Sequence, residues 1–327
     1  MRYVALGKTG LKVSRLAIGC MSFGGPDVKE FEWTLDYDAS KKVIERAIDL
    51  GMNFFDTADV YSWGRSEEIV GKALEGRRKD VVIATKVGLP TGGGPDNRGL
   101  GRKHVKASLA KSLEHLRTNH VDLYQIHRWD YATPIEEVLR TLTDAVREEG
   151  VVDHIGASSM WAWQFAKALY TSDMLGLERF ATMQNHYNLA YREEEREMIP
   201  LCIEEGVALM PWSPLARGFL SGRYKRRKRP ASLRYRKDGL MKERFFRPED
   251  FDVVERLVEV ARDKGTEPAQ VALAWLLSKE YVASPIVGPT RVEQLDELVE
   301  SVDIKLKASD VRRLEEPYKL HPVLGHR

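Results

Sequence analysis

Cysteine is scarce in this chain of 327 residues, which contains only Cys20 and Cys202. The two do not form a CxxC spacing, so we expect neither a disulfide framework nor a thiolate zinc site, and a reducing compartment fits best. An HExxH motif is also absent, and His115 and His120, five residues apart on a predicted helix, point in different directions. The sequence therefore predicts no metal site.

Long hydrophobic runs and an excess of charge of one sign are lacking as well. No stretch approaches the roughly 18 apolar residues that a membrane-spanning helix needs, and Met1–Val4 does not begin an apolar signal segment. The 51 Lys and Arg residues nearly balance the 49 Asp and Glu residues, for a formal net charge of +2. This composition gives no general reason to expect nucleic acid or a membrane as a partner, and we expect a cytoplasmic globular protein.

What the sequence does contain is a regular alternation of two kinds of segment. Short apolar runs that predict strands lie at Leu16–Cys20, Asn53–Thr57, Val81–Val87, Val121–His127, His154–Ser158, Ala181–Asn185, Val207–Trp212 and Ser284–Val287. Segments with the 3.6-residue period of amphipathic helices lie at Ala39–Leu50, Ser66–Leu74, Arg102–Leu116, Ile135–Glu149, Trp163–Tyr170, Glu193–Glu205, Phe251–Lys264, Pro268–Ser278 and Arg291–Val302. No segment resembles a linker, so we expect a single domain over residues 1–327.

Eight strand and helix repeats in one uninterrupted chain predict an α/β fold. Parallel strands need helical crossovers, and those helices then cover the faces of the sheet. The alternative, an open doubly wound sheet, is disfavoured because Gly19–Gly25 after the first strand lacks the GxGxxG fingerprint. We predict a (β/α)8 TIM barrel with extra helices. An N-terminal β-hairpin, formed by Tyr3–Leu6 and Leu11–Ser14, is expected to cap its closed end.

Polar residues follow the ends of several predicted strands. They are found in Asp56–Tyr61, Thr85–Lys86, Gln125–His127 and Trp212–Leu215. A strand end that replaces Val and Ile by Asp, Tyr, Lys and His has stopped building a core and presents polar groups at the mouth of the barrel. Because the carboxyl ends of parallel strands meet at one end, we expect these residues to converge on one site.

The same residues carry a family resemblance. The order and spacing typical of aldo-keto reductases are found in Phe54–Tyr61, Ser66–Glu68, Ala84–Lys86 and Asp122–His127, and the chain resembles that family from end to end. Within it, the chain is most similar to bacterial aryl-alcohol-dehydrogenase-like members and, more distantly, to the β-subunits of potassium channels, on the basis of Gly156–Ser159 and Trp212–Gly218. The resemblance implies an NADP-dependent barrel enzyme that reduces carbonyl groups.

Hydride transfer to a carbonyl leaves an alkoxide, so a proton must reach the oxygen as negative charge develops. The resemblance makes Tyr61 the donor, and because a free phenol has a pKa near ~10, we expect the charge of Lys86 to favour the ionised form. Asp56 would hold Lys86 charged and oriented. His127 would orient the carbonyl as a neutral donor or aid proton transfer in alcohol oxidation, and the sequence leaves both roles open. Taken singly each residue has a structural alternative, but the four together favour catalysis.

The resemblance also implies how a nicotinamide cofactor is held. Ser158, Ser159 and Gln184 would bind the carboxamide, with Ser159 in place of the Asn of many members, and Trp212 would stack on the ring. Ser213–Gly218 would wrap the diphosphate. The predicted cofactor-binding residues are Met21, Asp56, Ser158, Ser159, Gln184, Trp212, Ser213, Pro214, Leu215, Arg217, Gly218, Gly288, Thr290, Arg291, Gln294 and Glu297.

Cofactor preference is predicted from Ile286–Glu297, which matches the family's binding stretch for adenosine and its 2′-phosphate. Leu298 stands where many members have an Asn that holds the adenine. Arg291, at the start of a predicted helix, could meet the 2′-phosphate, which favours NADP (NADPH) over NAD. Its alternative is a solvated side chain.

A basic run lies at Arg223–Lys237, where nine of fifteen residues are Lys or Arg. The family resemblance implies that this loop folds over the diphosphate of the cofactor, and we interpret it as a lid, because a mobile cationic loop would attract and retain an anionic dinucleotide. A solvated loop without a ligand is the alternative. Nucleic acid is disfavoured, since no aromatic-interleaved binding module accompanies the run.

The predicted substrate-binding residues are Phe23, Trp63, Trp129 and Trp161, which fall in loops that should rim the mouth. They favour an apolar or aromatic aldehyde or ketone. Two other functions are open: an NADPH-binding sensor or auxiliary protein with slow turnover, and a lyase or isomerase that uses Lys86 as a Schiff base. The sequence carries no signal of an oligomeric state.

Overall fold

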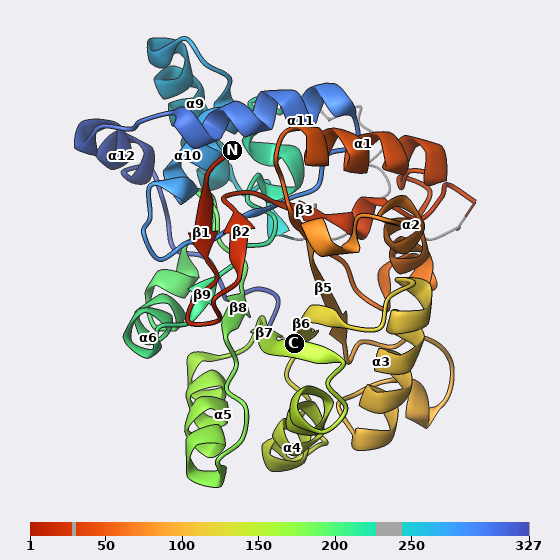
Figure 1. The fold of residues 1–327 in the computed structure, drawn as a ribbon. Coiled ribbons are helices and arrows are strands. Elements are labelled where there is room, and N and C mark those ends of the chain that lie inside the picture. Colours follow the sequence, from red (N-terminus) through yellow and green to blue (C-terminus); the bar gives the residue numbers. More distant parts are fainter. Residues whose placement is uncertain (28–30, 227–243, 327) are drawn as a thin grey trace.

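The computed structural model describes residues 1–27, 31–226 and 244–326, and it confirms the predicted barrel (Figure 1). Its strands are β3 (Ala17–Gly19), β4 (Phe54–Asp56), β5 (Val82–Val87), β6 (Val121–Ile126), β7 (Val152–Ser158), β8 (Thr182–Gln184), β9 (Ala208–Leu209) and β10 (Ile286–Val287). They are parallel neighbours in the order β10-β3-β4-β5-β6-β7-β8-β9. Each one coincides with a predicted strand.

The sheet closes on itself through the segments around its two edge strands. Backbone bridges pair Leu209 with Val282 and Trp212 with Ile286. The Ile286 N–H also donates to the carbonyl oxygen of Pro211 at 2.9 Å. These contacts join β9 to the chain that enters β10, so that edge N–H and C=O groups are paired rather than exposed.

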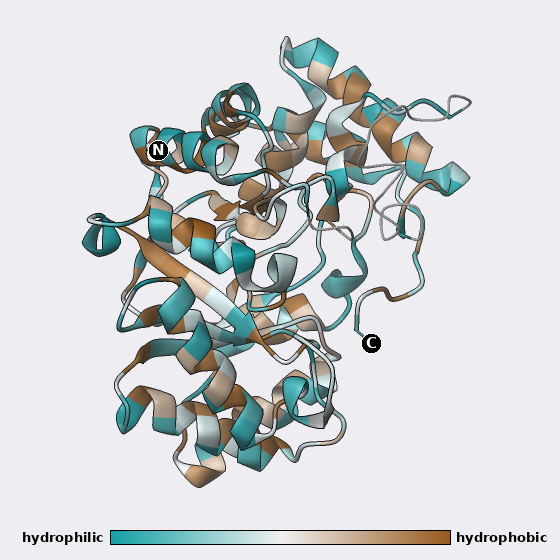
Figure 2. Cartoon of the chain, turned by 90° about the vertical axis from the view of Figure 1, so that its right-hand side faces the viewer, coloured by the Kyte–Doolittle hydropathy of each residue, from teal (hydrophilic) through white to brown (hydrophobic). Residues whose placement is uncertain are grey.

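Helices surround the barrel, and every predicted helix is present. They are α1 (Tyr37–Asp49), α2 (Arg65–Ala73), α3 (Arg102–His115), α4 (Ile135–Arg147), α5 (Ala162–Leu175), α6 (Met198–Glu205), α9 (Pro248–Lys264), α10 (Pro268–Leu277), α11 (Val292–Val299) and α12 (Ala308–Glu315). Helices in Figure 2 carry hydrophobic and hydrophilic residues side by side, as expected when one face is buried. None of the helices in the described ranges is long and apolar enough to cross a membrane.

Three helical details differ from the sequence-based expectation. The predicted helix Glu193–Glu205 divides into a 3-10 turn at Glu193–Glu195 and α6, whose first turn contains Pro200, where the missing N–H costs no helical hydrogen bond. The predicted helix Arg291–Val302 ends as α11 and continues as a 3-10 turn at Glu300–Asp303. The sequence does not predict α12, because Leu314 is its only buried residue and gives too weak an apolar period.

The predicted hairpin is present as β1 (Tyr3–Ala5) and β2 (Lys12–Ser14), which pair antiparallel. Leu6 and Val13 are fully buried and belong to one cluster with barrel residues such as Phe54 and Leu123. Gly7 has a φ of +59°, and a Cβ there would approach the carbonyl oxygen of Ala181 to 3.0 Å. The hairpin therefore seals the amino-terminal end of the barrel, as predicted.

We expect the Leu6→Ala substitution to lower the free energy of unfolding by about 2–5 kcal/mol, because the side chain is fully buried and its loss leaves a cavity under the barrel. Urea denaturation measures this change. Leu320→Ala is the matched control, since 68% of Leu320 is exposed and its truncation should change the free energy by less than about 0.5 kcal/mol. Equal effects of the two substitutions would contradict the role of the hairpin as a cap.

Alternation of side chains along the strands explains how a site forms at the other end. Phe54, Ala84 and Leu123 lie in the cluster inside the barrel, whereas Phe55 and Tyr124 lie in the larger core between strands and helices. Residues two positions further along a strand share a face. The interior faces of β4, β5 and β6 therefore continue upward from an apolar floor toward the mouth.

The interior face turns polar at that point. Asp56, Lys86 and Gln125 each stand two residues beyond one of the apolar interior residues, on β4, β5 and β6. The register pairs Lys86 directly with Gln125. A polar layer thus rests on the hydrophobic core inside the barrel, and its members are at most 2% exposed, so they need one another as partners.

Candidate active site

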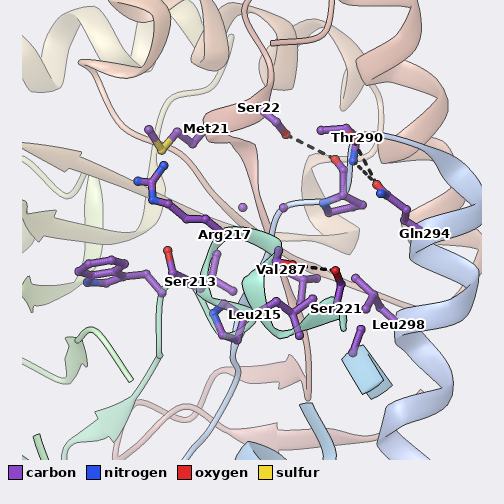
Figure 3. Close-up of a pocket in the computed structure, with 18 of the residues that line it drawn as sticks. Met21, Ser22, Ser213, Leu215, Arg217, Ser221, Val287, Thr290, Gln294 and Leu298 are labelled. Carbon is purple, nitrogen blue, oxygen red and sulfur yellow. Dashed lines mark hydrogen bonds between the residues drawn. The ribbon is translucent and has the colours of Figure 1, made fainter. Parts of the chain in front are cut away.

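A cavity of about 790 Å³ opens at the carboxyl ends of the strands. Figure 3 shows part of its wall, with Met21 and Arg217 near one end and Thr290 and Gln294 at the other. The predicted site residues that line it are Met21, Asp56, Tyr61, Gln184, Trp212, Ser213, Pro214, Leu215, Arg217, Gly218, Gly288, Thr290, Gln294 and Glu297. Its size is typical of pockets that hold an organic ligand.

Lys86 is the most buried charge of the site, with no exposed surface. Its Nζ donates to Asp56 Oδ2 at 2.6 Å, to the carbonyl oxygen of Thr57 at 2.7 Å and to the Tyr61 hydroxyl at 3.3 Å. Burial alone would lower the pKa of Lys86, but Asp56 and then Tyr61 raise it, and the net pKa lies above its usual value. Lys86 is therefore a fixed ammonium group whose three protons all have acceptors.

Asp56 is held by two amides as well as by Lys86. The Nε2 atoms of Gln125 and Gln184 donate to Asp56 Oδ1 at 3.0 and 2.8 Å. Gln184 thus reaches the carboxylate in addition to lining the cavity, where the sequence assigned it only to the cofactor. Gln125 was expected to lie near the site because it belongs to a polar strand end, but its contact with Asp56 was not predicted.

Tyr61 forms part of the cavity wall, and its hydroxyl lies next to Lys86. Burial is the largest effect on this group and raises its pKa, and the charge of Lys86 lowers the pKa without outweighing burial. Lys86 therefore favours the ionised phenol, as expected, but its effect on the pKa of Tyr61 is smaller than the effect of burial. Tyr61 is protonated at neutral pH, which is the state that a proton donor requires.

His127 lies beside Tyr61, with ring centroids 5.7 Å apart and planes at 80°. Burial, followed by the charges of Arg128 and Lys86, lowers the pKa of His127 well below its usual value. Its Nδ1 is buried without a hydrogen-bond partner among the described residues. The ring is therefore neutral near pH 7, a state that is compatible with both of the roles left open by the sequence.

Arg128 is a charged neighbour that the sequence analysis missed, although it directly follows His127. Its Nη1 donates to the His127 carbonyl oxygen at 2.5 Å and to Ser158 Oγ at 3.4 Å. Burial lowers the pKa of Arg128 to about 10, so it remains a cation at neutral pH. Its charge lowers the pKa of Tyr61 and thereby acts in the same direction as Lys86.

Trp212 is fixed in place by contacts on its ring and its nitrogen. Its Nε1 donates to Ser159 Oγ at 2.9 Å, and its ring stacks on His186 with centroids 4.1 Å apart. His186 stacks in turn on Tyr191 at 4.1 Å, and burial lowers the pKa of this imidazole well below its usual value. His186 was not predicted, because an uncharged stacked histidine has no sequence signature.

The far end of the cavity is formed by α11 and the loop before it. The Thr290 N–H donates to Gln294 Oε1 at 2.9 Å, and Ser22 Oγ donates to the Pro289 carbonyl oxygen at 3.4 Å (Figure 3). Leu298, which stands where many family members have an Asn, lines this end. Arg291 is exposed at the N-cap of α11 and lies outside the cavity wall, so its predicted contact with a 2′-phosphate stays a prediction.

Three of the four aromatic residues predicted at the rim carry exposed surface. Trp63 is 49% exposed, and Trp129 and Trp161 are partly exposed. Phe23 was misplaced: it has no exposed surface, packs in the core, and pairs its backbone with Leu35. An aromatic residue just after a strand can turn inward as well as outward, and local sequence does not distinguish the two.

The carboxyl-terminal segment covers the mouth. The Leu324 N–H donates to the Tyr191 hydroxyl at 2.9 Å, and His326 Nε2 lies 3.0 Å from Glu194 Oε1. The His326 ring also meets Trp161 edge to face, with centroids 4.7 Å apart.

The predicted basic lid is only partly described. Residues 227–237 of Arg223–Lys237 lie outside the described residues. Arg223 and Lys225 line the cavity, where their charges would favour an anion. Arg226 instead pairs with Asp252 at 2.6 Å on α9.

One group among the described residues has the donor types of a metal site. Its members are His120, Asp122 and Asp153, whose ligand atoms lie within 4.8 Å of one another. Asp122 Oδ2 already accepts from Arg78 Nη2 at 2.7 Å and from the Ile83 N–H at 2.8 Å. The group lies at the amino-terminal ends of β6 and β7, on the opposite side of the barrel from the cavity. It is a structural ion-pair cluster.

Comparison with known proteins agrees with this geometry. The chain is 42% identical to a versiconal hemiacetal acetate reductase of Aspergillus parasiticus over 98% of the chain and 99% of that protein. It is 37% identical to a Saccharomyces cerevisiae protein provisionally named an aryl-alcohol dehydrogenase, over 98% of the chain and 97% of that protein. An uncharacterized oxidoreductase of Bacillus subtilis, YrpG, is 35% identical over 97% of the chain and 95% of that protein.

These relatives are mostly fungal, so the predicted particular closeness to bacterial members, and the more distant one to potassium-channel β-subunits, is not confirmed. The coarser likeness to aryl-alcohol-dehydrogenase-like proteins is found in the yeast relative. The family model that describes the Aldo/keto reductase family matches residues 15–319. This chain belongs to the aldo/keto reductase family.

Proposed function

We propose that this chain is an NADP-dependent reductase of apolar or aromatic aldehydes and ketones, with Tyr61 as the proton donor. The observation that carries the proposal is the contact of Lys86 Nζ with both Asp56 and Tyr61 at the wall of the cavity. A cation that is fixed 3.3 Å from a phenol stabilises the phenolate that proton donation leaves behind. Names of two relatives, a reductase and a provisional aryl-alcohol dehydrogenase, support the same class of reaction.

The residues of the cavity fit a nicotinamide dinucleotide. Its wall combines the cations Arg217, Arg223 and Lys225, which suit phosphates, with the indole of Trp212, which suits a flat ring. Ser158 and Ser159 stand beside Trp212 through the Trp212 Nε1 to Ser159 Oγ bond. We assign these groups to the cofactor, with NADP preferred over NAD. When bound, NADPH supplies the hydride.

The chain's own residues would then complete the reaction at the carbonyl oxygen. Tyr61 donates its proton to that oxygen as negative charge develops there. Lys86 and Arg128 stabilise the resulting phenolate by their charges. His127, neutral because of its lowered pKa, donates a hydrogen bond that orients the carbonyl. The ion pair with Asp56 keeps Lys86 charged through these steps.

A lyase or isomerase that uses Lys86 as a Schiff base is disfavoured. A nucleophilic amine must be neutral and reach the substrate. Lys86 has no exposed surface, its pKa is raised, and its three donors are engaged. An NADPH-binding sensor with slow turnover remains the alternative, because it would use the same pocket.

The test is a steady-state assay of NADPH oxidation with 4-nitrobenzaldehyde, beside NADPH and NADH binding measured by tryptophan fluorescence. The proposal expects a kcat of the order of 1–10³ per second and tighter binding of NADPH than of NADH. A panel of phosphorylated aldehydes serves as the comparison. A far higher kcat/KM for that panel than for benzaldehydes would overturn the proposed substrate class and leave the reductase assignment intact.

A further inference from the structure

The residues after Tyr61 have an unusual backbone conformation. Ser62 and Trp63 have φ values of +48° and +58°, and Gly64 follows with +92°. Two consecutive left-handed residues with side chains are strained, because Cβ crowds the backbone there. Such a conformation persists only where the surrounding structure holds it. Something must therefore hold the turn that carries Tyr61.

Gly24 packs closely against this turn. A Cβ at Gly24 would overlap both Oγ and Cβ of Ser62, far inside van der Waals distance, and the next contact would be Thr34 Oγ1 at 3.3 Å. Ser62 is 1% exposed, and its Oγ has no hydrogen-bond partner among the described residues. Packing therefore holds Ser62, because its side chain makes no hydrogen bond with the described residues.

Gly24 itself is anchored on both sides. Its N–H donates to the Leu35 carbonyl oxygen at 2.9 Å, and the Leu35 N–H donates to the Ser22 carbonyl oxygen at 2.7 Å. The preceding residue, Phe23, is fully buried in the core. If a side chain at position 24 forces this residue and Ser62 apart, we expect the anchored residue 24 to stay in place and the strained turn at Ser62 to move.

Further contacts join the same two segments, which we call the clamp: residues 23–27 and 31–35 on one side and residues 61–65 on the other. Arg65 Nη1 lies 2.5 Å from Asp27 Oδ2 and 3.4 Å from the Gly24 carbonyl oxygen. The rings of Phe31 and Trp63 meet edge to face, with centroids 6.4 Å apart. The clamp therefore contacts the turn at Trp63 and Arg65 as well as at Ser62.

We propose that Gly24 is a positioning residue that sets the place of the Tyr61 hydroxyl through Ser62. The proposal rests on the proposed role of Tyr61 as proton donor. The Tyr61 hydroxyl makes the longest of the three Lys86 hydrogen bonds, at 3.3 Å, so a small shift of the turn would break it. Neither Gly24 nor Ser62 lines the cavity, so cofactor binding does not depend on them directly.

The test is a double-mutant cycle of Gly24→Ala and Ser62→Gly in the full chain. We expect Gly24→Ala to lower kcat for 4-nitrobenzaldehyde reduction about 10- to 100-fold, because displacement of a reacting group by about 1 Å has effects of that size. The Kd of NADPH should stay within about threefold. In the Ser62→Gly background the overlap is gone, so adding Gly24→Ala should change kcat by less than about twofold.

Gly101→Ala is the matched control, because a Cβ there meets no heavy atom within 4 Å and the φ of Gly101 is −60°. If Gly24→Ala alone does not fold, the comparison of Gly24→Ala/Ser62→Gly with Ser62→Gly still decides. Equal kcat in these two variants supports positioning through Ser62. A further loss of tenfold or more in the folded, NADPH-binding double variant overturns it, as does an unchanged kcat in Gly24→Ala.

A pH profile separates positioning from simple loss of stability. Loss of the Lys86 contact should move the rise of alcohol oxidation with pH to higher pH in Gly24→Ala, because the phenolate loses a stabilising charge. Ser62→Gly should restore the profile. Absence of all wild-type turnover would instead overturn the proposed function itself, so the two failures are distinguishable.

Discussion

Replacement of Tyr61 by phenylalanine is expected to lower kcat for aldehyde reduction by about 10²–10⁴, the usual range for the loss of a general acid. The ring and its contact with His127 remain, so only the hydroxyl that meets Lys86 is lost. Because that hydroxyl is an acid and not a cofactor ligand in this account, NADPH binding should stay within about twofold. Steady-state kinetics and a fluorescence titration on the same preparation measure both quantities.

Tyr131→Phe is the matched control for this substitution. Tyr131 is 67% exposed, so the loss of its hydroxyl should leave kcat within about twofold. The role of Tyr61 is contradicted if Tyr61→Phe keeps more than a tenth of the wild-type kcat. A loss of NADPH binding in Tyr61→Phe would point instead to a structural role of the hydroxyl.

The Lys86→Met substitution should have the second-largest effect, and it should lower both kcat and the free energy of unfolding. It removes the cation beside Tyr61, which we expect to lower kcat about 10²- to 10³-fold, because fixed charges in dry sites act strongly. It also leaves the Asp56 carboxylate buried and 2% exposed without its ammonium partner. Breaking a buried pair in this way should lower the free energy of unfolding by about 3–5 kcal/mol.

The Lys86→Met/Asp56→Asn variant separates the two effects. Removal of the orphaned charge should restore much of the lost stability, since both members of the buried pair are then neutral. It should not restore kcat, because Tyr61 still lacks its cation. Thermal unfolding and steady-state kinetics measure the two outcomes. Recovery of kcat together with stability would mean that Lys86 acts only as a structural group.

The strands and the polar layer at the mouth of the barrel could be predicted from sequence for one physical reason. A barrel strand that is buried on both faces reads as an apolar run, and Asp56 and Lys86 interrupt such runs at their carboxyl ends. The convergence of strand ends in a parallel barrel then brings the interruptions together. The contacts of Lys86 with Asp56 and Tyr61 agree with that convergence, whereas the separate roles of the three residues were implied by the family resemblance and stay predictions.

Residues whose environment depends on distant segments could not be placed. Phe23 and Trp63 are both aromatic residues in loops, yet one is fully buried and the other is 49% exposed. Phe23 packs in the core and pairs its backbone with Leu35, and no local pattern encodes these contacts. His186 is polar by type but serves as a flat neutral ring under Trp212.

The roles of Gly24 and Arg128 were missed for a related reason. A Cβ at position 24 would overlap the side chain of Ser62, which lies 38 residues further along the chain. A glycine in a loop gives no sign of such a neighbour. Arg128 acts through its charge on Tyr61, from the end of β6, two strands away from β4 in the sheet. Both effects depend on residues that are distant in sequence, so they are seen only in the folded structure.

The central claim is that this site transfers hydride from NADPH to a carbonyl while Tyr61 supplies the proton. Rapid mixing of the NADPH-bound protein with excess 4-nitrobenzaldehyde tests it most directly, with NADPH labelled by deuterium at either C4 position in parallel. We expect bound NADPH to be consumed within one turnover and one of the two labels to slow this phase. Bound NADPH that persists with every carbonyl offered would contradict the account and favour the sensor.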